Sequence, residues 1–336
     1  MPMNRPSSTL PASRQRRAVC AFLLAAGALP LAPAFAQAWP AKPVSLLVGV
    51  PPGGALDPFA RALADQLARV TGGNFVVDNK PGANGNLSAE ATLKAPPDGH
   101  ALWIGTQSMV TINPAAFSEL RWKPADFKPV LKGVEAPLVL VVHPSVPARN
   151  FAELAEWIRN PANKAAYASF SPGTPSHFLG HQLNERLGAS MPHVPYKGSA
   201  PQVTDMLGGQ VPLGFTQLAS AVQHIEAGKL RAIAVTSARR SRFLPQVPTV
   251  AEVGHKDLET TIWFGLFAPA ATPAPVLEAI RAAARKAHAD PAYRARLEAL
   301  NFDLPDESGA AFEKSIAAES ARWAALVKAT GFKAGN

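Results

Sequence analysis

The sequence has little cysteine and little charge. One cysteine, Cys20, occurs among 336 residues, which excludes a disulfide framework and any zinc module built on cysteines. Charged residues make up 17% of the chain, below the roughly 25% of an average soluble domain. Apolar residues make up 47%, which is enough for buried cores and excludes a disordered polyelectrolyte. The length fits two domains, at roughly 100–200 residues each.

Several chemical signatures are also missing. The sequence contains no GxSxG, HExxH, Walker A or complete GxGxxG pattern, so nothing local indicates a catalytic or nucleotide site. His177 and His181 could face a metal together on a helix, but no nearby cysteine completes a ligand set. The basic cluster of Arg239, Arg240 and Arg242 lacks interleaved aromatic residues, which favours a solvated loop over a nucleic-acid contact. We expect no metal, no cofactor, no nucleic-acid partner and no enzymatic activity.

Acidic residues are absent before Asp57. The basic segment 14–17 (RQRR) precedes the apolar run VCAFLLAAGALPLAPAFA, which ends in small residues. These are the three parts of a secretory signal peptide. We expect cleavage after Ala36 or Ala38 and export to the periplasm.

Two alternatives concern this segment. A membrane anchor is less consistent, because Pro30 and Pro33 interrupt a run shorter than the ~20 residues that span a bilayer. The pair Arg16-Arg17 leaves the Sec and Tat export routes both open. Cleavage after Ala36 removes Cys20 and four arginines, so the formal net charge falls from +9 to +5.

The remaining chain repeats a strand, a glycine-containing turn and a helix. The apolar run 44–50 (VSLLVGV) predicts a strand covered on both faces. PPGGA follows, and then a segment with helical periodicity, in which Asp57 suits the N-cap, Pro58 the first helical position and Gly72 the end. Units of this kind predict a parallel α/β sheet with ligands at the carboxyl ends of its strands.

The same pattern returns in the middle of the chain. Further strands are predicted in NFVVDN, ALWIGT, PLVLVVHP (Pro137–Pro144), AYASF, MPHVPYKG, QVPLGFTQ, LRAIAVTS and TIWFGLFAPA. FAELAEWIR, HFLGHQLNERLG and the C-terminal stretch predict helices. We expect an α/β fold with two lobes, each a sheet flanked by helices. Lobe 1 would comprise residues 37–140 and 264–336, and lobe 2 residues 141–263, with crossings near 139–142 and 262–267.

Two of the glycine turns precede helices and suggest anion sites. A helix N-terminus presents unpaired N–H groups and a partial positive charge, and a preceding glycine lets a carboxylate approach closely. Gly53-Gly54 and Gly173-Thr174 would supply such sites, although each pattern taken alone is more typical of a tight turn. Trp263, at a proposed lobe crossing, is the tryptophan that could face the cleft.

The chain resembles the Bug-type extracytoplasmic solute receptors of tripartite tricarboxylate transporters, from about Trp39 to Phe332. The segments that carry the resemblance include WPAKPVSLLVGVPPGGALD, VVDNKPGANGNLSAEA, YASFSPGTPSHFLG, VPYKGSAPQVTDMLGGQV, LRAIAVTSARRSRFLPQVPTVAEVG and WFGLFAPAATP. The resemblance implies a type II-like periplasmic binding protein whose ligand cleft lies between the lobes and closes on a small carboxylate. It also implies delivery of that ligand to the transporter's membrane subunits.

Carried over by position, the resemblance implies a ligand-binding set drawn from five loops. Its members are Pro52, Gly53, Gly54, Ala55 and Asp57; Gly105, Thr106, Gln107 and Ser108; Ser169, Phe170, Ser171, Gly173, Thr174 and His177; Tyr196, Lys197 and Gly198; and Thr216 and Gln217. Backbone N–H groups and the hydroxyls of Ser169, Ser171 and Thr174 would replace the water lost by a carboxylate. Lys197 could contact the ligand or remain a solvated cation at the rim.

The chain departs from the family's pattern at three places. Ala55-Leu56 stands where Ser-Thr is usual, Phe170 where a second serine is frequent, and Thr216-Gln217 where an Asp-Asn pair is common. Pro172 and Pro175 also stiffen one of the turns. Because hydroxyls and an acid are lost, we expect a less polar carboxylate, such as an aromatic or longer-chain acid, in preference to citrate or an amino acid.

Two other functions remain alternatives. A ligand-sensing adaptor for a sensor kinase, with no role in transport, has the same sequence signature. A periplasmic hydrolase would need a nucleophile and a base in contact, and the adjacent Ser176 and His177 do not by themselves make a triad. We expect a monomer.

Overall fold

The computed structural model describes residues 1, 39–53 and 55–335. The proposed signal peptide, its cleavage sites and Gly54 therefore lie outside the described residues. Within them, no helix is both long enough and apolar enough to cross a membrane.

Within the described residues, nine strands alternate with helices along the chain. The strands are β1 (Val44–Val48), β2 (Phe75–Asn79), β3 (Ala101–Thr106), β4 (Phe127–Val142), β5 (Tyr167–Ser169), β6 (His193–Pro195), β7 (Leu213–Gln217), β8 (Arg231–Val235) and β9 (Thr261–Pro269). The helices are α2 (Leu56–Thr71), α3 (Asn86–Lys94), α4 (Asn113–Ala116), α5 (Phe151–Arg159), α6 (Pro175–Leu187), α7 (Ser199–Leu207), α8 (Leu218–Glu226), α9 (Ala274–Ala289), α10 (Pro291–Glu298) and α11 (Gly309–Thr330). A single π-helical turn, η2 (Ser108–Ile112), follows β3.

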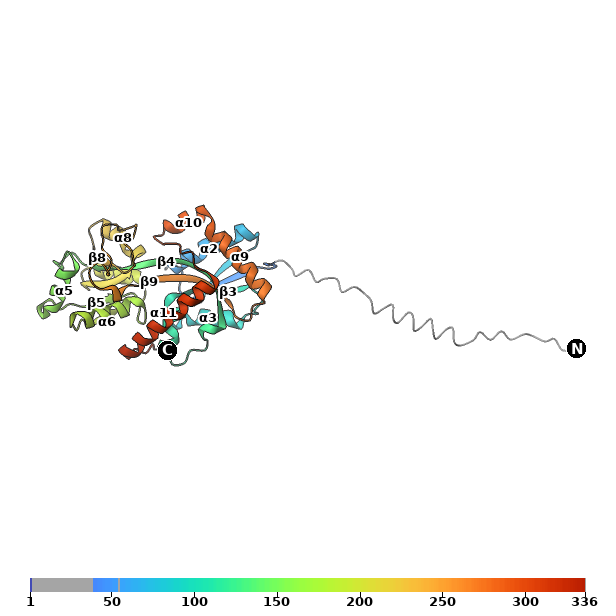
Figure 1. Ribbon diagram of the computed structural model, residues 1–336, viewed down its shortest axis with the longest axis horizontal. Coiled ribbons are helices and arrows are strands. Elements are labelled where there is room, and N and C mark those ends of the chain that lie inside the picture. Colours follow the sequence, from blue (N-terminus) through green and yellow to red (C-terminus); the bar gives the residue numbers. More distant parts are fainter. Residues whose placement is uncertain (2–38, 54, 336) are drawn as a thin grey trace. The chain divides into compact units, whose positions relative to one another are not determined.

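The strand order is β2-β1-β3-β9-β4-β7-β5-β6, with β8 paired to β4. β1 is parallel to β2 and β3, and β5 is parallel to β6 and β7. β4 and β9 run antiparallel to their neighbours, so the expected parallel sheet is in fact mixed. The α/β class is confirmed (Figure 1).

The long strand β4 joins the two parallel groups. Residues 127–137 pair with β9, residues 138–142 pair with β7, and residues 139–142 also pair with β8. The strand begins at Phe127, earlier than the predicted Pro137. The sequence does not predict this first part of β4, because Pro129 and Gly133 are unfavourable in a regular strand. The structure accommodates them with bulges between Pro129 and Leu131 and between Lys132 and Val134. The predicted lobe boundaries themselves stay a prediction.

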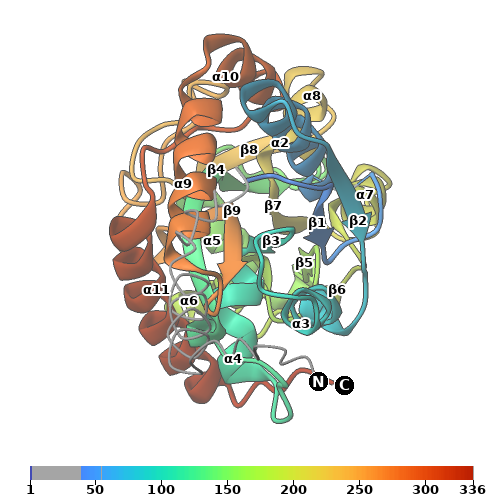
Figure 2. The same cartoon turned by 90° about the vertical axis from the view of Figure 1, so that its right-hand side faces the viewer.

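Successive side chains of β3 and β9 point alternately to the two faces of the sheet, and helices cover each face. Leu102, Ile104, Phe264 and Leu266 pack in the core that includes α2 and α9. Trp103 and Trp263 point to the opposite face, toward α3 and α11. This period of two is what a sheet covered on both faces requires, and Figure 2 shows α2 and α9 on one side of the strands and α3 and α11 on the other.

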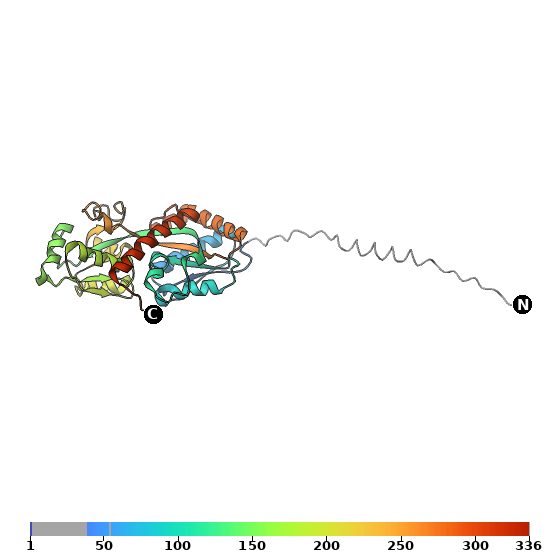
Figure 3. The ribbon, with the colours of Figure 1, turned by 60° about the horizontal axis from the view of Figure 1, so that its bottom comes forward.

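The helix α11 connects distant parts of the molecule. Near its start, Phe312 packs against Phe267 of β9, with ring centroids 5.6 Å apart. Toward its end, Trp323 packs against Phe178 of α6, at 5.8 Å. Figure 3 shows the helix running diagonally between these two regions.

Candidate functional site

The carboxyl ends of β5, β6 and β7 bring three of the predicted loops together. Ser169 of β5 stands in register with Pro195 of β6 and Phe215 of β7. The N–H of Gly198 donates to the carbonyl of Phe170 at 2.7 Å. The segments 169–177, 196–198 and 216–217, which are far apart in sequence, therefore form one surface.

Three helices begin at this surface without a side-chain cap. Their N-cap residues are Thr174 for α6, Gly198 for α7 and Gln217 for α8, and none accepts a capping bond through its side chain. Asn150 and Asp290 cap α5 and α10, whereas α2, α3, α4, α9 and α11 also lack a side-chain cap. What distinguishes α6, α7 and α8 is that their N-termini lie at the same end of the sheet. Uncapped helix N-termini leave N–H groups available to an anion. The convergence of three of them is a geometry suited to a carboxylate.

The hydroxyl groups of the same surface are already bonded within it. Ser169 Oγ lies 2.7 Å from His193 Nε2, and Thr174 Oγ1 donates to the carbonyl of Ser171 at 2.6 Å. The N–H of Gly173 donates to His177 Nδ1 at 3.3 Å. These contacts shape the loop, so its hydroxyls would have to exchange partners before they could hold a ligand.

The remaining predicted residues of this surface differ in their availability. Tyr196 donates through its hydroxyl to Asp205 at 2.9 Å, and burial together with that carboxylate raises the pKa of Tyr196 to about 12. Lys197 is exposed. Thr216 is fully buried, and its hydroxyl oxygen has no hydrogen-bond partner among the described residues.

A second group of predicted residues lies at the carboxyl ends of β1 and β3. These parallel strands pair through Val48 and Ile104, so the loop after β1 and the residues 105–108 follow neighbouring strands. Gly53 is exposed with φ +93°, and open space surrounds the position of a Cβ. Gln107 is 2% exposed, and its Oε1 lacks a partner within the described part of the chain.

Asp57 does not cap α2, contrary to the prediction. The helix begins at Leu56, with Ala55 as its N-cap, and the buried Asp57 carboxylate accepts two bonds from Arg61 and one from Asn79. Burial alone would raise the pKa of Asp57, but the bonds from Arg61 and Asn79 lower it below its ordinary value. The partner Asn79 comes from β2, which no local pattern could indicate.

Two predicted apolar residues lie in the core. Trp263 is 1% exposed, packs against Phe312 at 5.0 Å and donates through Nε1 to Glu319. It therefore does not face a cleft in this structure. Phe170 is 8% exposed and belongs to the main core, so its ring adds little apolar surface to the loop. Sequence reasoning missed this because an apolar residue beside a glycine turn fits either position.

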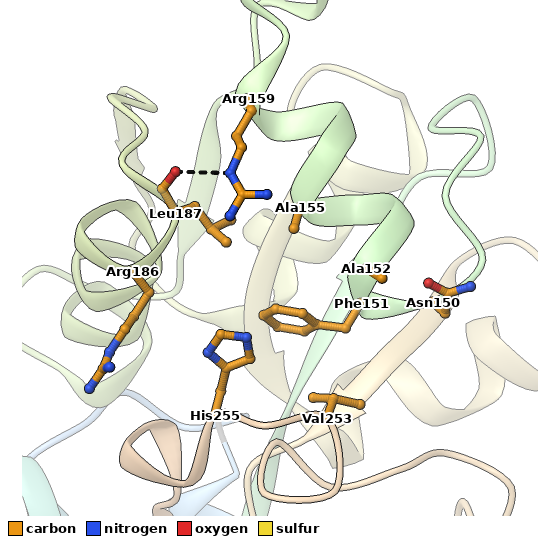
Figure 4. Close-up of a pocket in the computed structure, with 9 residues that line it drawn as sticks. All are labelled: Asn150, Phe151, Ala152, Ala155, Arg159, Arg186, Leu187, Val253 and His255. Carbon is orange, nitrogen blue, oxygen red and sulfur yellow. Dashed lines mark hydrogen bonds between the residues drawn. The ribbon is translucent and has the colours of Figure 1, made fainter.

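A surface pocket of about 400 Å³ lies elsewhere, between α5 and α6. Figure 4 shows Arg159 and Phe151 of α5 beside it, with the His255 ring next to Phe151. Its polar groups already have protein partners, since Arg159 Nε donates to the carbonyl of Leu187 and Arg186 pairs with Asp257. The His255 ring packs on Phe151 at 4.3 Å. None of the predicted ligand-binding residues lines this pocket.

The histidines of the α6 motif, which the sequence offers as metal ligands, lie within residues 39–53 and 55–335. No group of three or more potential ligands occurs there. His181 pairs with Glu185 at 3.4 Å, whereas His177 stacks on His193. The two histidines of the α6 motif therefore have separate partners.

Comparisons with known proteins agree with this architecture. Residues 59–332 match the model of the tripartite tricarboxylate transporter family receptor. Protein BugT of Bordetella pertussis is 32% identical over 308 residues, which cover 90% of this chain and 93% of BugT. The structure of the periplasmic binding protein BugD is 33% identical with a TM-score of 0.78, covering 88% of this chain and 99% of BugD. The structure of Rpa4515 of R. palustris with adipate is 31% identical with a TM-score of 0.80, at the same coverages. The chain belongs to the receptor family of the tripartite tricarboxylate transporters.

Proposed function

We propose that this protein is a periplasmic receptor that captures a small carboxylate and delivers it to the membrane subunits of a tripartite tricarboxylate transporter. The observation that carries the proposal is the convergence of three uncapped helix N-termini, at Thr174, Gly198 and Gln217. Such N–H groups and helix dipoles stabilise an anion without a metal or a basic side chain.

The second half of the site would come from the loop after β1. Gly53 has a left-handed backbone and open surroundings, so a carboxylate can approach this loop closely. The Gly53 N–H bonds to the Asp57 carboxylate, so a ligand would have to displace that bond or use the other N–H groups of the loop. We propose that the groups at β1–β3 and at β5–β7 close on the ligand from opposite sides by a hinge motion. No bond is made or broken in this function, and no residue is assigned a catalytic role.

The ligand we propose is a dicarboxylate or monocarboxylate of low polarity. The buried position of Phe170 removes one argument for this class. A second argument remains, because the chain carries Thr216-Gln217 where an acid could have paired with a ligand ammonium group. The adipate bound by Rpa4515 has the chemistry expected here, with two carboxylates on an aliphatic chain.

The proposal is tested by mass spectrometry of the ligand that co-purifies, followed by thermal unfolding with adipate, benzoate, malate, citrate and glutamate. A ligand present at 100 times its Kd stabilises the fold by about 2.7 kcal/mol. We expect adipate or benzoate to raise Tm more than citrate or glutamate does. Preferential stabilisation by glutamate would contradict the ligand class, and flat melting with every acid would contradict carboxylate capture.

A matched pair of glycine variants tests the location of the site. Gly53→Val introduces a side chain at the proposed carboxylate loop, where φ is +93°. Gly228→Val makes the same change at φ +68°, also in open space, in the turn after α8. We expect both variants to fold and only Gly53→Val to lose the ligand-induced rise in Tm. Equal retention of that rise would exclude the β1 loop from the site.

A further inference from the structure

The segment that follows α11 lies against the loop after β5. α11 ends at Thr330, and its C-cap Gly331 has a φ of +63°. The ring of Phe332 then meets His177 and Phe178 of α6 edge-on, with centroid distances of 5.1 and 5.6 Å. Two residues on, the N–H of Ala334 donates to the carbonyl of Ala116 in α4 at 3.0 Å. The segment is thus held against α6 on one side and α4 on the other.

Phe332 also covers Gly173. A Cβ at Gly173 would lie 2.9 Å from Phe332 Cε1, and the φ of Gly173 is +68°. Gly173 and His177 are the donor and the acceptor of one hydrogen bond, from the N–H to Nδ1. Phe332 therefore contacts both partners of the bond that shapes the turn.

The contacts continue from His177 to the end of β5. The His177 imidazole stacks on His193 with centroids 4.1 Å apart and planes 16° from parallel. His193 Nε2 lies 2.7 Å from Ser169 Oγ. A continuous series of side chains thus runs from Phe332, at the half-buried outer side, to Ser169, which is fully buried.

We propose that Phe332 is a positioning residue for the carboxylate-binding loop 169–174. Its ring holds the His177 imidazole against His193 and keeps the Gly173 turn in its left-handed geometry. The N-terminus of α6 is thereby presented to the ligand in one orientation. This inference rests on the proposed function, because it assumes that the loop holds a carboxylate.

Three variants test it. Phe332→Ala removes the ring, Phe332→Leu retains an apolar side chain, and Phe117→Ala removes a ring that packs against the same Trp323 cluster. No ring contact between Phe117 and His177 or Phe178 occurs among the described residues. A general loss of packing would lower Tm in both alanine variants, so Tm serves only as a control for folding.

The distinguishing readouts come from NMR without ligand. Burial, together with His193 and His181, lowers the pKa of His177 to about 4. In Phe332→Ala we expect this pKa to rise by about one unit or more, because the imidazole becomes hydrated. We also expect the Gly173 amide to exchange roughly tenfold faster. Phe332→Leu and Phe117→Ala should retain the wild-type values. Unchanged values in Phe332→Ala would overturn the proposal.

Binding of adipate, measured by isothermal titration calorimetry, connects the loop to the ligand. We expect Phe332→Ala to weaken binding about tenfold, a difference of about 1.4 kcal/mol, and Phe117→Ala to bind as the wild type does. Equal affinity of Phe332→Ala and the wild type would refute the positioning role. If the wild type binds none of the acids tested above, the proposed function fails, and the NMR readouts decide separately whether Phe332 shapes the loop.

Discussion

The imidazole rings of His177 and His193 are stacked, with centroids 4.1 Å apart and planes 16° from parallel. Two positive charges at this distance would repel each other, so the arrangement favours neutral rings. Burial, together with His193 and His181, lowers the pKa of His177 to about 4, and burial lowers the pKa of His193. The stacked geometry of the loop therefore depends on both imidazole rings being neutral.

This relationship predicts that the protein loses stability on acidification. Between pH 6.5 and about 4, an unfolded His177 binds a proton while the folded one does not, so the free energy of unfolding decreases as the pH falls. His177→Asn can still accept the Gly173 N–H bond but does not titrate. Urea denaturation at several pH values should show a shallower decline for this variant than for the wild type. Parallel curves for the two proteins would contradict the assignment.

Glu319 is the next group whose replacement is informative. Its carboxylate accepts from Gln107 Nε2 at 2.7 Å and from Trp263 Nε1 at 3.0 and 3.1 Å. Glu319→Ala leaves both buried donors unpaired, and we expect the free energy of unfolding to fall by about 2–3 kcal/mol. Glu319→Gln retains an acceptor oxygen and should cost less. A loss equal to that of the alanine variant would show that the hydrogen bonds are not responsible.

The charge of Glu319 has a separate effect. Burial raises the pKa of Glu319, against opposing hydrogen bonds from Gln107 and Trp263. A raised carboxyl pKa disfavours ionisation in the folded state, so its stabilising contribution is complete below the ordinary pKa and is lost as the pH rises through the folded value. The stability difference between the wild type and Glu319→Gln should therefore be more favourable to the wild type at pH 4.5 than at pH 7.5. A constant difference would contradict a raised pKa.

Gly180 tests whether packing or helix propensity dominates in α6. In an exposed helix, replacing glycine with alanine gains about 1 kcal/mol. Here a Cβ would overlap the ring of Tyr167 from β5, and overpacking costs about 1–3 kcal/mol. We expect Gly180→Ala to lower the free energy of unfolding by about 1–2 kcal/mol. The Tyr167→Leu background should reduce this loss, as measured by a double-mutant cycle. If Gly180→Ala has a higher Tm than the wild type, then Tyr167 and β5 accommodate the added methyl group without loss of stability, which would contradict the prediction.

The Asp57 carboxylate is predicted to stabilise the fold through its hydrogen bonds with Arg61 and Asn79. Asp57→Ala leaves Asn79 and Arg61 without their acceptor, and we expect the free energy of unfolding to fall by about 1–3 kcal/mol at neutral pH. Because the pKa of Asp57 is lowered, this contribution is present above its ordinary pKa of 3.8 and is lost as the pH falls. Denaturant titrations at pH 7 and pH 3 should show the difference.

The control for Asp57 is Asp65→Ala on the same helix. Asp65 pairs with Arg296 at 2.8 Å, but both side chains are about half exposed, and exposed ion pairs contribute about 1 kcal/mol or less. Equal losses for the two variants would show that the buried network at Asp57 adds nothing to an ordinary surface pair.

Much of the fold follows from local pattern. The apolar runs at Val44–Val48 and Ala101–Thr106 become strands at or near their predicted limits, and FAELAEWIR becomes α5 without adjustment. Gly72 ends α2 with φ +72°. These features depend on hydrophobic periodicity and backbone preferences over a few residues, which are legible along a single chain. Positions of the glycine turns before α2 and α6 are local in the same sense.

The contacts that organise the candidate site required the tertiary structure. The local sequence predicts that Asp57 is an N-cap, but in the structure its carboxylate accepts a hydrogen bond from Asn79 of β2. The sequence likewise allows Trp263 to face the cleft, but its ring is buried and donates to Glu319 of α11. Phe332 contacts Gly173 although the two lie far apart in the sequence. Local sequence patterns cannot predict such partners. A residue has the same sequence neighbours whether its side chain contacts water, a ligand or another helix. The tertiary structure determines these contacts, because burying apolar rings is favourable and because buried polar groups must find hydrogen-bond partners.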